Sequence, residues 1–201
     1  MVFHVVKKFI SDDDVKIVQE YIKGISFNTK DNHPPLHDHL YTDFNAPFDI
    51  HTRGEMPDYI LNIFSKYSEG LYKTLIKNID VNYHAPMFSK HYIARCNTGF
   101  EIGPQWDESK PDRTIKSIIY WNNDFEGGKM SFPNIYVDGL TLEPGDLIYF
   151  VDCETNAHKI SKITEGTLYM SEAWAGLKGK PWMFNVDYEK TDWDNWEIKG
   201  F

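Results

Sequence analysis

Short alternating segments dominate the chain from residue 88 onward. Apolar and polar residues alternate there with period two, as in half-buried strands, and turns rich in Gly, Asn, Asp and Pro separate the segments. Many short strands at this spacing favour a sandwich or barrel over a parallel sheet. The segments expected to form strands are 88–96, 115–121, 129–132, 139–142, 147–151, 159–164 and 168–174.

Two helices are expected ahead of these strands. Ser11 stands before three consecutive aspartates, which is typical of a helix start, because the hydroxyl caps free N–H groups and the carboxylates face the positive end of the helix dipole. Apolar residues then recur at helical spacing as far as Gly24, and a second helix with a wide apolar face begins at Pro57. Residues 26–55 contain three prolines and predict mostly irregular chain. The whole pattern predicts an α+β fold.

Length and composition fit a single domain over residues 1–201. Hydrophobic residues make up 41% and aromatic residues 15% of the chain, which is enough for one well-packed core. We expect residues 1–87 to form a helical support with a loop, and residues 88–174 to form the strand-rich core. Residues 175–201 are expected to dock on that core, because they hold the aromatic residues Trp182, Phe184, Tyr188, Trp193 and Trp196.

The charge balance limits the possible partners. The chain has 21 Lys and Arg against 30 Asp and Glu, a net charge of −9, and no basic stripe. Because an acidic surface repels phosphate backbones, nucleic acid is not an expected partner. The chain start lacks the order of a signal peptide, and no apolar run approaches the ~20 residues of a membrane-spanning helix. We therefore expect a soluble, cytoplasmic protein with no membrane partner.

Residues that could bind a metal or take part in catalysis follow one another in a set order through the strand-rich half. Gln105 and Asp107 come after a glycine-containing turn, Arg113 opens a strand that ends near Tyr120, and His158 follows three further strands. This order resembles the iron(II)- and 2-oxoglutarate-dependent oxygenases, in particular the prolyl-4-hydroxylase-like branch, over roughly residues 92–174. The resemblance implies a double-stranded β-helix, the jelly-roll or cupin-like architecture, with the N-terminal helices packed on one sheet.

The resemblance also implies an activity and two cofactors. A relative of this kind is a dioxygenase that hydroxylates a peptidyl or small-molecule substrate with Fe(II) and 2-oxoglutarate. Such oxygenases hold iron by two imidazoles and one carboxylate, which leaves one side of the metal open. Asp107 and His158 match two of these ligand positions, and Gln105 stands at the position of the first histidine.

Two positions depart from the family pattern. The amide oxygen of Gln105 is a poorer iron ligand than imidazole, so metal affinity should fall by at least the ~10–100-fold that losses around a metal site typically cause. The family also holds the far carboxylate of the keto acid by an Arg or Lys ten residues after the last His, where this chain has Leu168. Without that cation the site lacks a charge-assisted hydrogen bond worth roughly 1.5–3 kcal/mol.

Three residues are candidates for contacting the keto acid instead. Tyr120 matches a family position that touches it, and Lys116 shares its face of the strand about 13 Å away at ~3.3 Å per residue. Arg95 lies on the strand before Gln105, but a shift of one residue in register turns Cys96 inward and Arg95 outward. The alternative role for Arg95 and Lys116 is a solvated charge on a strand face.

A second group of imidazoles lies outside this order. His33, His37 and His39 flank Asp38, and His37 and His39 would point the same way in an extended segment, as two ligands of one metal do. The alternative is a surface loop near the mouth of the barrel that contacts substrate.

Two functions stay open from the sequence. In the first, the protein is an oxygenase in which Asp107 and His158 hold iron, Gln105 or water fills the third place, and Arg95 or Lys116 replaces the missing anchor. In the second, it is a catalytically degenerate relative that keeps the jelly roll as a binding or scaffold module. Membership in the oxygenase family requires the side chains of Asp107 and His158 to meet inside the closed sheet of the barrel.

Overall fold

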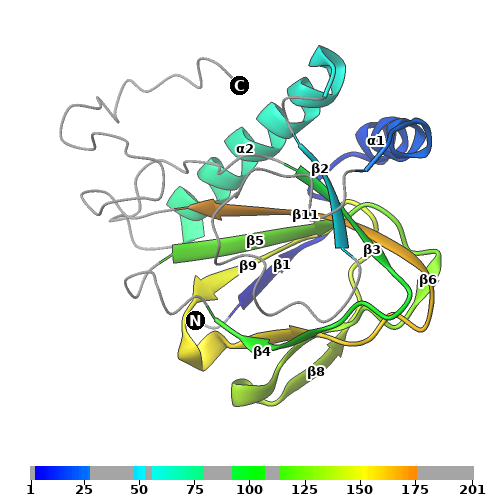
Figure 1. The fold of residues 1–201 in the computed structure, drawn as a ribbon. Coiled ribbons are helices and arrows are strands. Elements are labelled where there is room, and N and C mark those ends of the chain that lie inside the picture. The colour runs from blue at the N-terminus through cyan, green and yellow to red at the C-terminus, as the bar shows by residue number, and fades with distance from the viewer. Residues whose placement is uncertain (1–2, 28–47, 53–55, 79–91, 107–113, 176–201) are drawn as a thin grey trace.

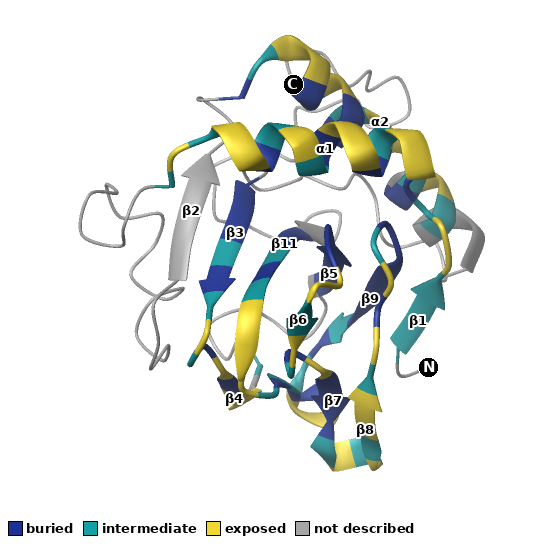
Figure 2. Ribbon diagram, turned by 90° about the vertical axis from the view of Figure 1, so that its right-hand side faces the viewer, coloured by how far each residue is buried: buried dark blue, intermediate teal, exposed yellow. Residues whose placement is uncertain are grey.

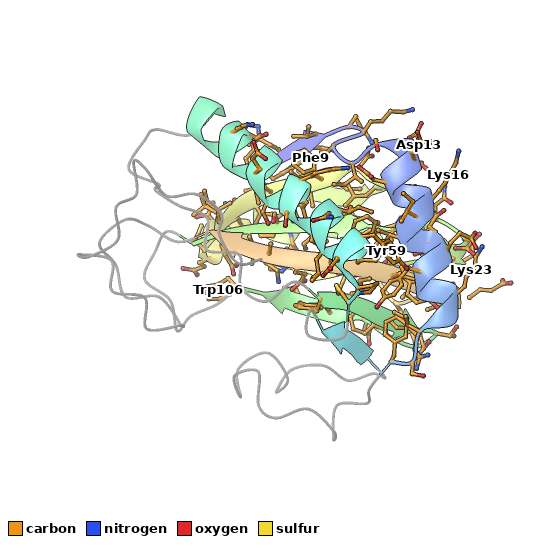
Figure 3. The ribbon with its side chains drawn as sticks, turned by 90° about the horizontal axis from the view of Figure 1, so that it is seen from above. Phe9, Asp13, Lys16, Lys23, Tyr59 and Trp106 are labelled. Carbon is orange, nitrogen blue, oxygen red and sulfur yellow. The ribbon has the colours of Figure 1, made fainter. Side chains whose placement is uncertain are left out.

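Two antiparallel sheets face each other, and two helices cover the outer side of the larger sheet (Figure 1). The computed structural model describes residues 3–27, 48–52, 56–78, 92–106 and 114–175. Seen from above, both helices lie across the strands of the larger sheet (Figure 3). This arrangement confirms the predicted α+β class and the packing of the N-terminal helices on one sheet.

The described strands pair only in antiparallel fashion. The larger sheet has the order β1-β9-β5-β11-β3-β2, with β6 also paired to β11, and the smaller has the order β4-β10-β7-β8. The strands of the larger sheet are β1 (Phe3–Val6), β9 (Leu147–Asp152), β5 (Thr114–Tyr120), β11 (Glu165–Ala175), β3 (Tyr92–Asn97), β2 (Phe48–Thr52) and β6 (Phe125–Glu126). Those of the smaller sheet are β4 (Ile102–Gln105), β10 (His158–Ile160), β7 (Met130–Phe132) and β8 (Val137–Leu140).

The first helix, α1 (Asp12–Gly24), begins where the sequence predicts. The Ser11 hydroxyl accepts a hydrogen bond from the backbone N–H of Asp14 at 3.1 Å. Its outer side is exposed while Val15, Val18 and Ile22 are buried on its inner side (Figure 2).

The second helix, α2 (Asp58–Asn78), packs on the same sheet. The ring of Phe64 in this helix packs edge to face against the ring of Trp121, with ring centroids 5.6 Å apart. Such aromatic pairs add to the free energy gained from apolar burial, so this contact helps to fix the helix on the sheet.

The alternation along β5 separates two hydrophobic clusters. Ile115 and Ile119 belong to the cluster under the helices, whereas Ile118 and Tyr120 belong to the cluster between the sheets. Lys116 also points between the sheets, because its ammonium contacts a residue of the smaller sheet. The prediction that Lys116 and Tyr120 share one face of their strand is therefore confirmed.

Several strands were not predicted. Strands β1 and β2 form the edges of the larger sheet, and β2 lies within the region 26–55 that we expected to be irregular. Strand β8 starts two residues before the predicted 139, and β10 ends at Ile160 rather than at residue 164. Segments of three to five residues carry little periodicity of their own, so pairing with a distant neighbour decides whether they become strands. The predicted tail docking falls on 176–201, outside the described residues.

Neither described helix combines the length and the apolar content that crossing a lipid bilayer requires.

Asp146 joins the start of the chain to the turn before β9. Asp146 is 1% exposed, and its carboxylate accepts hydrogen bonds from the backbone N–H groups of Lys8 and Glu143, each at 3.0 Å. The ammonium of Lys7 donates a third at 2.6 Å. Burial by itself raises the pKa of Asp146, but these hydrogen bonds outweigh it and hold the pKa below the ordinary 3.8.

Replacing Asp146 by Asn should lower the free energy of unfolding at pH 7 by about 1–3 kcal/mol. The NH₂ group of the asparagine would face a backbone N–H group, and two donors cannot form a hydrogen bond with each other. The depressed pKa stabilises the fold above pH 3.8, and this stabilisation is lost as the pH falls through the lower pKa of the folded state. Urea unfolding at pH 7, 4 and 3 should therefore show a smaller loss of stability in the variant. Equal losses in both proteins would contradict this role.

Candidate functional site

His158 opens β10 and is 1% exposed. In the antiparallel pairing of β10 with β4, its partner across the ladder is Gln105. Residues opposed in this way have Cβ atoms about 4.5–5.5 Å apart. The fold thus brings two of the three predicted ligand positions side by side, although they are far apart in the sequence. The third, Asp107, lies outside the described residues, as do His33, His37 and His39.

A buried ammonium lies against His158. The Nζ of Lys116 is 3.2 Å from Nε2 of His158 and 3.3 Å from Oε1 of Glu172. Lys116 and Glu172 are 5% and 4% exposed. The hydroxyl of Tyr92 donates to Oε2 of Glu172 at 2.9 Å, so both oxygens of this carboxylate have partners.

The strand register explains why Lys116 and Glu172 meet. Lys116 is paired with Trp174 across β5 and β11, and Glu172 lies two residues from Trp174 on the same strand. Side chains two residues apart on a strand share a face, so Glu172 is the diagonal neighbour of Lys116. Both point toward the smaller sheet, where His158 lies.

The imidazole of His158 is neutral in this arrangement. An ammonium has three donors and no acceptor, so Lys116 donates to Nε2 and that nitrogen carries no proton. Burial, followed by the positive charge of Lys116, lowers the pKa of His158 well below its ordinary 6.5. The positive charge of the group therefore resides on Lys116, and Glu172 neutralises it.

Tyr120 lies in the interior cluster as predicted, but its hydroxyl is engaged by the backbone. The hydroxyl donates to the carbonyl oxygen of Gly128 at 2.8 Å. Burial raises the pKa of Tyr120 far above the ordinary 10.0. A contact with a small acid would have to compete with this hydrogen bond.

Arg95 is not brought together with His158. Its guanidinium lies 4.8 Å from the centroid of the Phe27 ring, and Phe27 packs against the cluster under the helices. Cys96 is fully buried in the cluster between the sheets. Of the two registers that the sequence left open, the structure has the one with Cys96 inward.

Leu168 is paired with Cys96 across β11 and β3 and is fully buried in the same interior cluster. The position where the family has its anchoring cation therefore faces the interior here, and it carries an apolar side chain.

Two residues of the site were missed from the sequence, Glu172 and Tyr92. A signal was present for Glu172, because it interrupts an alternating series of inward positions that includes Leu168 and Met170. A carboxylate on the inner face of a strand needs a partner, and Lys116 was the inward cation already identified.

Solved structures with this fold were found at low sequence identity. A viral collagen prolyl hydroxylase from Paramecium Bursaria Chlorella virus-1, in complex with 2-oxoglutarate, is 15% identical, with 87% of this chain and 96% of that chain covered and a TM-score of 0.62. The chain has the fold of the prolyl-4-hydroxylase-like oxygenases. A Trichoplax adhaerens prolyl hydroxylase bound to a peptide of hypoxia inducible factor is 16% identical, covering 86% and 82% of the two chains, with a TM-score of 0.64.

A more distant neighbour is HygX from Streptomyces hygroscopicus, with nickel and 2-oxoglutarate bound. It is 10% identical, covers 88% of this chain and 83% of its own, and has a TM-score of 0.58. No protein-family model matches the chain. No curated protein matches it either.

The described residues at the centre of this fold do not by themselves make up an iron site. In the described part of the chain, no three His, Cys, Asp or Glu side chains converge as metal ligands. The Nε2 of His158 already accepts from the ammonium of Lys116. A doubly charged ion about 4 Å from that ammonium would be repelled by about 8 kcal/mol at an effective dielectric constant of about 20. Leu168 offers no charge to the far carboxylate of a keto acid.

Removing the ammonium alone should destabilise the fold more than removing both charges. Lys116→Met leaves Glu172 ionised and unpaired, and breaking a buried ion pair in this way costs about 3–5 kcal/mol. The double variant Lys116→Met with Glu172→Gln leaves no buried charge and should recover most of that loss. Urea unfolding at pH 7 measures both, and a single variant as stable as the double would contradict the pairing.

Proposed function

We propose that this chain is a non-catalytic relative of the prolyl-4-hydroxylase-like dioxygenases, a binding or scaffold module built on their jelly roll. One observation carries the proposal. The Nζ of Lys116 lies within 3.2 Å of the imidazole nitrogen of His158 and within 3.3 Å of a buried carboxylate oxygen of Glu172. A cation that belongs to the protein itself thus takes up the nitrogen that a metal ion would need.

The pattern of substitutions supports the same conclusion. The positions that carry chemistry are altered, with Gln105 for a metal-binding histidine and Leu168 for the anchoring cation, while the sheets and helices that build the fold are intact. A fold by itself does not imply the activity of its relatives.

The partner that this proposal favours is a peptide segment or a small molecule. The Trichoplax neighbour is bound to a peptide, which supports a peptidyl partner for the shared architecture. The net charge of −9 disfavours nucleic acid. Neither Fe(II) nor 2-oxoglutarate is required for binding of this kind.

The test is release of succinate and CO₂ from 2-oxoglutarate in the presence of Fe(II). The wild-type protein should release no more than the Asp107→Ala variant. The viral collagen prolyl hydroxylase serves as the positive control for the assay. Release by the wild type clearly above that of Asp107→Ala would contradict the proposal.

A dioxygenase is the second candidate, favoured by the register that pairs Gln105 with His158. In this case Asp107, His158 and Gln105 would hold iron, and the Lys116 side chain would have to leave His158. The wild type would then bind Fe(II) and 2-oxoglutarate, and Asp107→Ala would weaken both. Under the first candidate the two proteins bind them equally poorly.

A further inference from the structure

We propose that the outer side of α1 binds the same side of a second copy of this chain, so that the two helices lie antiparallel around a two-fold axis. We call this surface the α1 face, and it consists of Asp13, Lys16, Ile17, Glu20 and Lys23. It lies on the helix side of the larger sheet, away from the space between the sheets (Figure 1). The inference therefore goes beyond the proposed function and does not depend on whether the interior supports catalysis.

The five residues of the α1 face form one stripe along the helix. Positions 13, 16, 20 and 23, with 17 beside 16, are separated by three or four residues, which places them on one side of an α-helix. All five are exposed, and the buried residues of α1 lie on the opposite side, against the sheet. Figure 3 shows Asp13, Lys16 and Lys23 following one another along the helix.

An apolar spot lies at the middle of this stripe. Among the described residues, three large apolar side chains are exposed, Ile17 at 42%, Tyr59 at 53% and Tyr136 at 97%. Ile17 belongs to the α1 face. Tyr59 of α2 lies beside it, because its ring packs edge to face against Tyr21, one helical turn after Ile17. Two of the three thus gather where an interface between helices needs its apolar centre.

The four charges of the α1 face alternate in sign along the helix. The order is negative at Asp13, positive at Lys16, negative at Glu20 and positive at Lys23. The outer two lie five residues on either side of position 18, and the inner two lie two residues on either side of it. In an antiparallel pair centred there, each carboxylate faces an ammonium of the other copy. A parallel pair would place like charges opposite one another, so the order of the charges selects the antiparallel arrangement.

These charges are available to a second copy. Neither Asp13 nor Lys16 forms an ion pair with another described residue, whereas the aspartates on either side of Asp13 are paired with lysines of their own chain. Glu20 and Lys23 contact each other at 2.6 Å, but their side chains are still 73% and 69% exposed. An opposite charge from outside can therefore approach all four.

The neutrality of the α1 face matters because the chain as a whole repels its own copies. Each copy has a net charge of −9, and a net charge of one sign keeps proteins apart. With two acidic and two basic residues, the α1 face is a place where two copies meet without this repulsion. A two-fold axis makes every contact occur twice, and it brings Ile17 against Ile17 of the second copy.

Sedimentation velocity of the full chain tests this arrangement. The wild type should pass from monomer to dimer with a dissociation constant of about 10–500 µM, because so limited an interface belongs to the small, transient class. Lys16→Glu places two glutamates opposite each other at both symmetric contacts and should weaken the dimer by about tenfold or more. Glu20→Lys should do the same. The double variant Lys16→Glu with Glu20→Lys exchanges the signs and should restore the dimer.

Lys73→Glu is the matched control. Lys73 is an exposed lysine of α2 with a glutamate, Glu69, four residues away, as Lys16 has Glu20. The substitution changes the net charge by the same amount but lies outside the α1 face, so the dimer should persist. Urea unfolding of each variant at pH 7 separates a lost dimer from a lost fold.

A disulfide tests the position of the two-fold axis. In a Cys153→Ser background, Ile17→Cys brings two thiols together at the centre of the interface and should give a disulfide-linked dimer on mild oxidation. Lys73→Cys in the same background should stay monomeric. Cys96 is fully buried and is present in both proteins.

The inference is overturned by a wild type that remains monomeric up to about 1 mM, including one that uses Ile17 to bind a different protein. It is also overturned by a dimer that Lys16→Glu leaves as strong as before, because that dimer uses another surface. If a charge variant does not fold, the disulfide decides, and a dimer that forms no faster with Ile17→Cys than with Lys73→Cys contradicts the α1 face. None of these results bears on succinate release, which tests the proposed function separately.

Discussion

An ammonium enclosed between two sheets must be neutralised and hydrogen bonded where it lies, because water cannot do either. In this protein Glu172 supplies the negative charge from the larger sheet, and His158 supplies the hydrogen-bond acceptor from the smaller sheet. This contact links the two sheets across the interior. Tyr92 secures the carboxylate from the far side, while apolar residues such as Leu168 close the remaining space.

Structures 10–16% identical to this chain share its architecture, and some hold 2-oxoglutarate or nickel. What the relatives and this chain have in common is the pair of sheets with the helices over one of them. HygX, with nickel and 2-oxoglutarate bound, shows that such a frame accommodates a metal and a small acid. In this chain the salt bridge of Lys116 and Glu172 lies between the two sheets.

Local rules predicted much of this frame. The Ser11 cap, the inward face shared by Lys116 and Tyr120, and the strands at 147 and 168 follow from capping and from period-two alternation, and the structure confirms them. The edge strands β1 and β2 were missed, because they depend on pairing with segments far away in the sequence. Whether Arg95 or Cys96 pointed inward also depended on long-range register, which a single sequence does not define.

The role of Lys116 changed most between sequence and structure. Its distance from Tyr120 along the strand suggested a reach toward a keto acid, whereas the structure directs it across the interior to His158. The partner that decides this, Glu172, lies 56 residues further along the chain, on β11. Its effect becomes visible only when the strand order is known.

Crystals of the wild-type protein soaked in Fe(II) or Zn(II), measured at the metal absorption edge, test the central claim most directly. We predict no anomalous peak between the side chains of Asp107 and His158, with the Nζ of Lys116 in contact with Nε2 of His158. An anomalous peak at bonding distance from that nitrogen, with the Lys116 side chain turned away, would contradict it.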